Sequence, residues 1–399
     1  MKKKMKLNQN NWQKIEFGKF AHLGKQKYQP SAKESLPCVE LECIEKETGI
    51  ISHTLCSSEL ASTKNRFTKG SVLFGKLRPY LRKYAMPNFD GVCTSEIWVL
   101  QPDVSICIPD FLFLLVQSEK FIYTANISCG TRMPRAEWDL IENLPLIVPP
   151  LSEQHRIVAV LETWDKAISL TKRLIEQKEI QKKHLMRQLL TGKTRLKGFS
   201  GKWEKHILSD FTCRITRRNT ENNKNIVTIS AKFGFIPQTN FFTKNVASSS
   251  VENYFLIYKN EFCYNKSYSL GYPSGTIKRL KDFEKSVVTP LYICFAIKDN
   301  KHLDYVFFEQ YCETGLFNRY LDKIANEGGR AHGLLNVSVN DFFKLPLNVP
   351  SIKEQQAIAE ILSAADRDIS LLKEKLAKLQ QQKKGLMQIL LTGKVRLTI

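Results

Sequence analysis

The pattern of apolar residues along the chain predicts two very long helices. Over about residues 354–392, apolar side chains recur at alternating steps of three and four, the heptad spacing of helices that pack side by side. Lys383 interrupts this seam, which otherwise consists of Ile358, Leu362, Ala365, Ile369, Leu372, Leu376, Leu379, Leu386 and Leu390. A second helix is predicted over about residues 153–191, with a looser middle at Thr171, Lys178 and Lys182. Its seam is Ile157, Leu161, Trp164, Ile168, Leu185 and Leu189.

The two helices belong to one repeated module. The motif Leu-Pro-Leu at 144–146 recurs at 345–347, and Leu-Leu-Thr-Gly-Lys at 189–193 recurs at 390–394, an unbroken offset of 201 positions. A repeat of this length is a large module and not a short solenoid unit. Prolines precede each helix, and Gly192 and Gly393 follow it as left-handed helix stops.

A helix of roughly 38 residues is about 57 Å long, too long to be covered by one small domain. Each helix therefore needs a partner for its apolar stripe, and the other copy is the obvious one. A solvated surface helix or a zipper between two copies of the chain are the alternatives. Neither helix is expected to cross a membrane, because charges interrupt the stripe every few residues.

The regions before each helix, residues 1–143 and 201–343, have the pattern of mixed α/β domains. Short apolar runs at 71–74 and 97–100 predict strands, separated by turn signals, and residues 109–116 predict a helix that starts at a proline. The second region resembles a diverged copy, with a strand at 292–295 and a helix at 304–308. We therefore expect an α+β protein with two globular domains and two strand-helix segments, residues 144–200 and 344–399.

Composition adds a strong positive charge to this picture. The 399 residues carry a formal net charge of +21, with a pI of about 9.5 and 43% hydrophobic residues. A folded protein with such a field most often binds nucleic acid, and an anionic membrane is the second choice. The basic N-terminus is not followed by an apolar stretch, so we expect no signal peptide. The ten cysteines are scattered, as in a cytoplasmic protein with reduced thiols.

Basic residues interleaved with tyrosine form the candidate DNA contacts, because Lys and Arg neutralise phosphates and Arg also binds the guanine edge. In the first domain these candidates are Lys76, Arg78, Tyr80, Arg82, Lys83, Arg132 and Arg135. In the second domain they are Arg214, Arg217, Arg218, Lys266, Tyr268, Lys278, Arg279, Arg330 and His332.

Motifs of catalysis are missing from the sequence. We find no phosphate-binding Gly-x-x-x-x-Gly-Lys-Ser/Thr, no Gly-x-Gly-x-x-Gly and no His-Glu-x-x-His. A Glu-x-Lys of the kind that restriction nucleases use occurs at 176–178, but it lies in the middle of a helix, where it matches by chance. We expect no catalytic residue and no metal or cofactor site in this chain, and a reader of nucleic acid is favoured over an enzyme.

These motifs together resemble the specificity subunit of type I restriction-modification systems. The resemblance rests on the order of domain and helix, the Leu-Pro-Leu-x-Val-Pro entry, the Glu-Gln at each helix start and the Leu-Leu-Thr-Gly-Lys exit. It covers nearly the whole chain. The globular domains match only in outline, through pieces such as residues 76–81 and 94–96.

The resemblance implies two target recognition domains, each reading half of a split, asymmetric site on double-stranded DNA. The helices would form an antiparallel coiled coil with pseudo-two-fold symmetry, set the unread spacer and bind two methyltransferase subunits. Those subunits would use S-adenosylmethionine to methylate adenine, and two restriction subunits would use ATP and magnesium to translocate and cut DNA. The alternatives are a cryptic DNA methyltransferase or nuclease that acts alone, and a basic coiled-coil scaffold.

Overall fold

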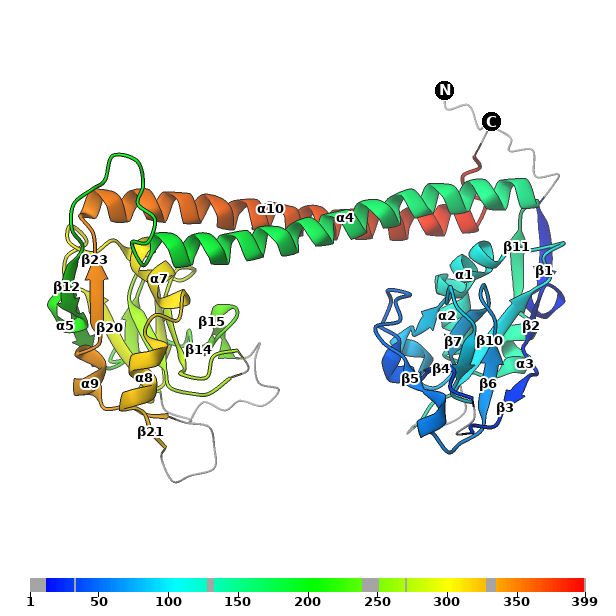
Figure 1. Ribbon diagram of the computed structural model, residues 1–399, viewed down its shortest axis with the longest axis horizontal. Coiled ribbons are helices and arrows are strands. Elements are labelled where there is room, and N and C mark those ends of the chain that lie inside the picture. Colours follow the sequence, from blue (N-terminus) through cyan, green and yellow to red (C-terminus); the bar gives the residue numbers. More distant parts are fainter. Residues whose placement is uncertain are drawn as a thin grey trace. The chain divides into compact units, whose positions relative to one another are not determined.

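The protein consists of two compact units, and each contains one globular domain and one end of each long helix. The computed structural model describes residues 12–31, 34–127, 133–238, 251–269, 271–327 and 335–397. Unit 1 comprises residues 1–172 and 374–399, and unit 2 comprises residues 173–373. The units therefore divide the chain within both helices (Figure 1).

The domain of unit 1 is built on two sheets. The four-stranded sheet is antiparallel, in the order β2 (Ala21–Leu23), β10 (Ile97–Pro102), β7 (Val72–Gly75) and β8 (Tyr84–Ala85). The five-stranded sheet has the order β3 (Lys27–Tyr28), β6 (Lys64–Phe67), β9 (Gly91–Cys93), β4 (Pro37–Val39) and β5 (Leu55–Cys56). Its helices are α1 (Pro109–Gln117), α2 (Glu119–Ala125) and α3 (Trp138–Glu142). The predicted helix at 109–116 and strands at 71–74 and 97–100 are confirmed.

The continuous run of apolar residues in β10 is explained by the burial of both faces of this strand. Side chains of a strand alternate between its two faces, and both faces of this strand are covered. Trp98 and Leu100 belong to the core beneath the helices, whereas Ile97 and Val99 belong to a second core on the other face of the sheet.

The domain of unit 2 repeats the four-stranded sheet, while its other described strands form two-stranded pairs. Its antiparallel four-stranded sheet has the order β13 (Thr212–Ile215), β20 (Ile293–Ile297), β17 (Phe262–Asn265) and β18 (Thr276–Arg279). Two-stranded pairs complete it: β14 (Val227–Ser230) with β15 (Gly234–Pro237), β16 (Phe255–Tyr258) with β19 (Lys285–Val288), and β21 (Asn326–Glu327) with β22 (Leu335–Asn336). Its helices are α5 (Leu208–Phe211), α7 (Tyr305–Glu313), α8 (Asn318–Ile324) and α9 (Val339–Phe343).

A two-stranded ribbon leads from each domain into a long helix. In unit 1, β1 (Gln13–Glu16) pairs with β11 (Pro145–Val148), which continues into α4 (Leu151–Leu189). In unit 2, β12 (Glu204–Ile207) pairs with β23 (Pro346–Val349), which continues into α10 (Ile352–Leu391). The glutamine of the Glu-Gln motif secures each helix start. The Gln154 amide donates to the carbonyls of Ile106 and Pro149, and Gln355 does the same with those of His302 and Pro350.

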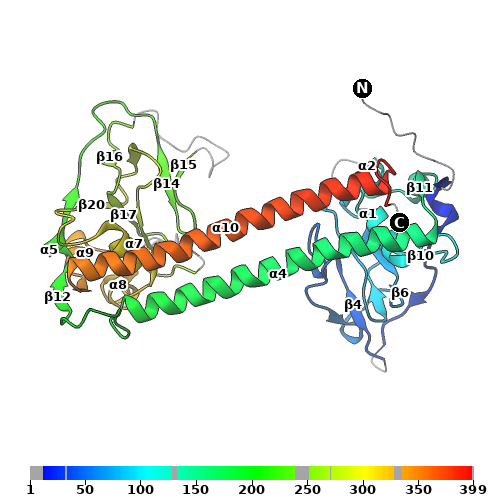
Figure 2. The same ribbon diagram turned by 90° about the horizontal axis from the view of Figure 1, so that it is seen from above.

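The long helices are antiparallel neighbours. In unit 1 the start of α4 shares a core with the end of α10, and in unit 2 the end of α4 shares a core with the start of α10 (Figure 2). The predicted seam residues Ile157, Leu161, Leu189, Ile358, Leu362, Ile369 and Leu390 are buried. The others are half-buried: Trp164, Ile168, Leu185, Ala365, Leu372, Leu376, Leu379 and Leu386.

The loose middle of α4 contains one seam residue that the sequence analysis missed. Ile175 is buried, whereas Leu170 and Leu174 are exposed. Lys182, which the heptad pattern places on the seam, reaches across to Asp366 at 2.6 Å, and Lys383 makes the same contact with Asp165 at 2.6 Å. Since both pairs are related by the offset of 201, the seam lysines join the two helices in the same way at both ends.

Candidate nucleic-acid interface

The loop after the third strand of the four-stranded sheet is the same element in both domains. Strands β7 and β17 occupy equivalent places in their sheets, and each is followed directly by a lysine, Lys76 or Lys266. The backbone carbonyl of Lys76 accepts a hydrogen bond from Ala136 N at 2.9 Å, and that of Lys266 accepts one from Leu335 N at 3.0 Å. Each lysine is thus fixed against the segment that leads into α3 or α9. In unit 2 this segment adjoins β21, at the end of the unit remote from α10 (Figure 1).

Both loops present a tyrosine to solvent. Tyr80 is 55% exposed and Tyr268 is 59% exposed. In unit 1, Arg78 and Arg82 flank the short 3-10 turn Pro79–Leu81 with φ angles of 53° and 50°. This left-handed conformation is uncommon for arginine and stores strain, which functional sites often do. Arg78 is held in it by a hydrogen bond from its N–H to Pro134 O at 2.8 Å, and its side chain is exposed.

Five of the basic residues predicted to contact DNA form ion pairs with carboxylates of their own domain. In unit 1, Arg82 forms a bidentate pair with Glu119 at 2.7 and 3.0 Å, and Arg135 forms one with Glu96 at 3.0 and 3.2 Å. The hydrogen bonds from Arg82 lower the pKa of Glu119 to about 2. The carboxylate partners thus already engage the charges of these arginines within the protein.

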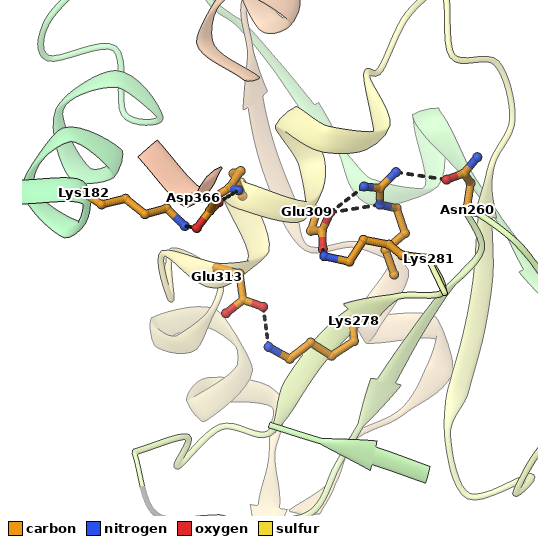
Figure 3. A network of polar contacts seen from close by, with 9 residues as sticks. Lys182, Asn260, Lys278, Lys281, Glu309, Glu313 and Asp366 are labelled. Carbon is orange, nitrogen blue, oxygen red and sulfur yellow. Dashed lines mark hydrogen bonds and ion pairs between the residues drawn. The ribbon is translucent and has the colours of Figure 1, made fainter. Parts of the chain in front are cut away.

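In unit 2 the paired residues form a network around α7 (Figure 3). Glu309 binds Arg279 at 2.7 Å and Lys281 at 2.7 Å, and the buried Lys278 binds Glu313. The guanidinium of Arg217 pairs with Glu261 at 3.2 Å and lies 4.1 Å from the centroid of the Tyr258 ring. These contacts stabilise the domain, and the role of Arg217, Lys278 and Arg279 in binding DNA stays a prediction.

The remaining predicted contacts differ in what their side chains bond to. Lys83 and Arg218 donate to the backbone carbonyls of Leu41 and Asn253. Arg214 is exposed on β13. Arg132, Arg330 and His332 lie outside the described residues. Among the interactions of the described residues, the side chains of Lys76, Arg78, Tyr80, Arg214, Lys266 and Tyr268 have no charged or hydrogen-bonded partner, so they are available to a ligand.

One exposed aromatic residue of unit 2 was not among the residues predicted from the sequence. Phe233 is 69% exposed in the turn between β14 and β15, and Lys232 lies beside its ring. The signal in the sequence is the tripeptide Lys232-Phe233-Gly234, which is too short to distinguish a functional residue from an ordinary one. Its place in the fold is what makes it a candidate.

Metal binding and membrane insertion can be judged from the described residues. No group of three or more His, Cys, Asp or Glu side chains there is arranged to hold a metal ion. None of the helices formed by these residues is long and apolar enough to span a membrane.

Comparison with known proteins identifies the family. The family model of the type I restriction modification DNA specificity domain matches the chain twice, over residues 10–179 and 202–381. The type I restriction enzyme EcoDI specificity subunit of Escherichia coli is 28% identical over 156 residues, which cover 38% of this chain and 34% of that protein. The MjaVIII specificity subunit of Methanocaldococcus jannaschii is 23% identical over 330 residues, covering 77% of this chain and 75% of that protein.

The fold is shared with a solved chain from a study of complex assembly and conformational transition in a type I restriction-modification system. That chain superposes with a TM-score of 0.62 at 16% identity, covering 97% of this chain and 99% of its own length. The two matches to the family model also correspond to the two repeated modules seen in the sequence. The chain therefore belongs to the DNA specificity subunits of type I restriction-modification systems, and it is a recognition subunit, not a catalytic one.

Proposed function

We propose that each globular domain reads one half of a split, asymmetric site on double-stranded DNA through the loop that follows β7 or β17. The observation that carries this proposal is the equivalence of Lys76 and Lys266, which follow corresponding strands and are fixed by corresponding backbone hydrogen bonds. Two equivalent loops in one chain are what the recognition of a target with two separate halves requires. Their different side chains suit halves of different sequence.

The chemistry of these loops fits a duplex. Lys76 and Lys266 would neutralise phosphates and fix the register of each domain on the DNA. Arg78, held in a strained backbone conformation with its side chain exposed, is the residue of the first loop that would bind a guanine edge with two hydrogen bonds. We infer that the lengths of α4 and α10 set the number of unread base pairs between the halves.

We further propose that the outward faces of the long helices bind methyltransferase subunits. Leu170 on α4 is 64% exposed and Leu371 on α10 is 62% exposed, and they are equivalent under the offset of 201. Two equivalent exposed leucines suit two copies of one partner. In this proposal S-adenosylmethionine acts in the methyltransferase subunits, and ATP and magnesium act in two restriction subunits.

The first experiment is a map of methylated adenines. The chain is co-expressed with its methyltransferase partner in a host that lacks adenine methylation, and modified adenines are located by sequencing. We expect one motif with two specific parts around a gap of fixed length. A continuous short motif would mean that one domain alone reads DNA, and no modification by a competent partner would favour a scaffold.

Exchange of one domain tests whether the halves are read separately. Residues 11–143 are replaced by the first domain of another member of the family, and the map is repeated. One half of the motif should change while the other half and the gap stay the same. A change in both halves, or in neither, would contradict the assignment of one half to each domain.

Salt dependence tests the loop lysines. Lys76→Ala and Lys266→Ala should each weaken binding of the methyltransferase complex to all sequences and lower the slope of log affinity against log salt by about one. Lys344→Ala, at an exposed lysine after α9, is the control and should leave the slope unchanged. Slopes equal to that of the unmodified complex would place the phosphate contacts elsewhere.

The methyltransferase surface is tested by polar substitutions at the two leucines. Leu170→Ser with Leu371→Ser should leave folding intact and reduce complex formation with the methyltransferase subunit, measured by sedimentation. Lys166→Ser with Arg367→Ser is the matched control, because these exposed residues are also 201 positions apart. Equal binding by the leucine and control variants would remove the leucines from the interface.

A further inference from the structure

The β14–β15 hairpin of unit 2 is a two-stranded ribbon whose turn presents an aromatic ring to solvent. Its register pairs Ser230 with Gly234, so residues 231–233 form a three-residue turn. Gly234 closes the turn with a φ of 74°, the left-handed conformation that such turns require and that glycine adopts without strain. The backbone N–H of Phe233 donates to Ser230 Oγ at 3.3 Å, which fixes the position of the ring-bearing residue.

Phe233 is unusual for a hairpin turn. Its side chain is 69% exposed, although burial of a phenylalanine is favourable. The base of the ribbon, by contrast, is anchored in the second core of the unit through Val227, Ile229 and Phe235. The ammonium of Lys232 lies 5.3 Å from the centroid of the Phe233 ring. The ribbon therefore offers an apolar ring and a positive charge together on a firm base.

Asn265 joins this ribbon to the loop that carries Lys266 and Tyr268. Its Nδ2 donates to the carbonyl of Ile229 in β14 at 3.4 Å, and its Oδ1 accepts from the N–H of Ser267 at 3.0 Å. One side chain thus bonds to both elements, at the end of β14 from which the turn starts. The hairpin that carries Lys232 and Phe233 is thus linked through Asn265 to the loop that carries Lys266 and Tyr268.

The described residues of unit 1 contain no equivalent of this link between hairpin and loop. Gly75 occupies the place of Asn265, since both end the third strand of the sheet. The connection between β4 and β5, which corresponds to the hairpin, packs back on its own domain. A Cβ at Gly49 in this connection would lie 2.7 Å from the Phe113 ring, and Glu47 reaches Arg82 at 3.5 Å. The β4–β5 connection of unit 1 and the β14–β15 hairpin of unit 2 therefore differ in what they present to solvent.

We propose that the β14–β15 ribbon enters the major groove of the half-site that unit 2 reads, and that Phe233 contacts the methyl group of a thymine there. This inference rests on the proposed function. The major groove admits a two-stranded ribbon, and the thymine methyl is the apolar group that it displays. Lys232 next to the ring meets a phosphate, and Asn265 acts as the positioning residue that sets the ribbon against the Lys266 loop.

The test uses the methyltransferase complex and the target given by the methylation map. Each thymine of the two half-sites is replaced in turn by uracil, which lacks only the methyl group, and affinity is measured by competition. For the unmodified complex, one uracil in the half-site of unit 2 should weaken binding about fourfold, the effect of one buried methyl group. In Phe233→Ala, thymine and uracil at that position should bind equally.

Two further variants separate the role of the Phe233 ring from that of the Lys232 charge and from the positioning role of Asn265. Lys232→Ala should weaken binding to all DNA and keep the thymine preference. Asn265→Ala should reduce the preference while Phe233 is still present, because the ribbon loses its bond to the loop. If Asn265→Ala keeps the full preference for thymine over uracil, Asn265 does not position the ribbon.

The outcomes distinguish this inference from the proposed function. If the complex binds its target specifically and Phe233→Ala leaves every thymine preference unchanged, the ribbon does not read thymine and the inference fails alone. If the unmodified complex shows no sequence preference at all, the proposed function itself fails. If Phe233→Ala loses a thymine preference in the half-site that unit 1 reads, the assignment of Phe233 to the half-site of unit 2 is also wrong.

Discussion

Arg195, in the tail that follows α4, donates two hydrogen bonds to the buried carboxylate of Glu354 in the first turn of α10, at 2.6 and 2.7 Å. These residues lie 159 positions apart in the chain. Arg396 and Glu153 repeat the contact at 2.7 and 3.1 Å, each 201 positions away from its counterpart. Each unit is thus closed by an ion pair between the end of one long helix and the start of the other.

We predict that removal of this contact destabilises the unit that contains it. Arg195→Ala leaves the carboxylate of Glu354, whose side chain is 2% exposed, without its ion pair inside the protein. The melting temperature should fall further than for Lys193→Ala, an exposed change in the same tail, and Arg195→Lys should restore it only in part because lysine cannot bond in the bidentate way. Equal melting temperatures for the alanine variants would contradict this role.

The seam between the helices should be sensitive at its buried leucines. Leu161→Ala and Leu362→Ala remove side chains that are 1% and 0% exposed, and each should lower the free energy of unfolding by about 3 kcal/mol. Leu371→Ala, at an exposed leucine of the same helix as Leu362, should change it by less than about 0.5 kcal/mol. Chemical denaturation measures all three, and a similar loss at Leu371 would show that the outward face is also covered.

The cross-helix pair of Lys182 and Asp366 should respond to reversal of its charges. Lys182→Asp alone places a second carboxylate beside Asp366, which also accepts from Gln310 at 2.8 Å, and should destabilise the protein. Lys182→Asp with Asp366→Lys should recover part of the loss. Because Asp366 is half exposed, the coupling in a double-mutant cycle should be about 0.5–1 kcal/mol. A coupling of zero would mean that apolar contacts alone align the helices.

Glu119 should give unit 1 a pH-dependent stability. Hydrogen bonds from Arg82, and a contact with Lys384 of α10, lower the pKa of Glu119 from 4.5 to about 2. A lowered pKa stabilises the fold above the unfolded value, and this contribution is lost as the pH falls from about 4.5 towards 2. The difference in denaturation midpoint between the unmodified protein and Glu119→Gln should therefore be largest near pH 7 and shrink in acid. A difference independent of pH would assign it to packing.

The long helices and their repeat follow from the sequence alone. Helix periodicity is a local property, so the spacing from Ile358 to Leu390 suffices to predict a helix and its apolar face. Prolines before the helices and Gly192 and Gly393 after them are local stops for the same reason. The repeat of the strand-helix segments also follows, because their offset of 201 is visible without any structure.

The state of each basic side chain is decided only by the tertiary structure. Arg82 and Arg279 look like Lys76 and Lys266 in the sequence, but carboxylates 37 and 30 positions away neutralise the two arginines. Since an ion pair depends on contacts between distant segments, no local pattern separates a charge that is available to DNA from one that holds the fold. The same limit explains Ile175, where packing selects one of two adjacent apolar residues, and Phe233, whose exposure depends on how its hairpin meets the sheet.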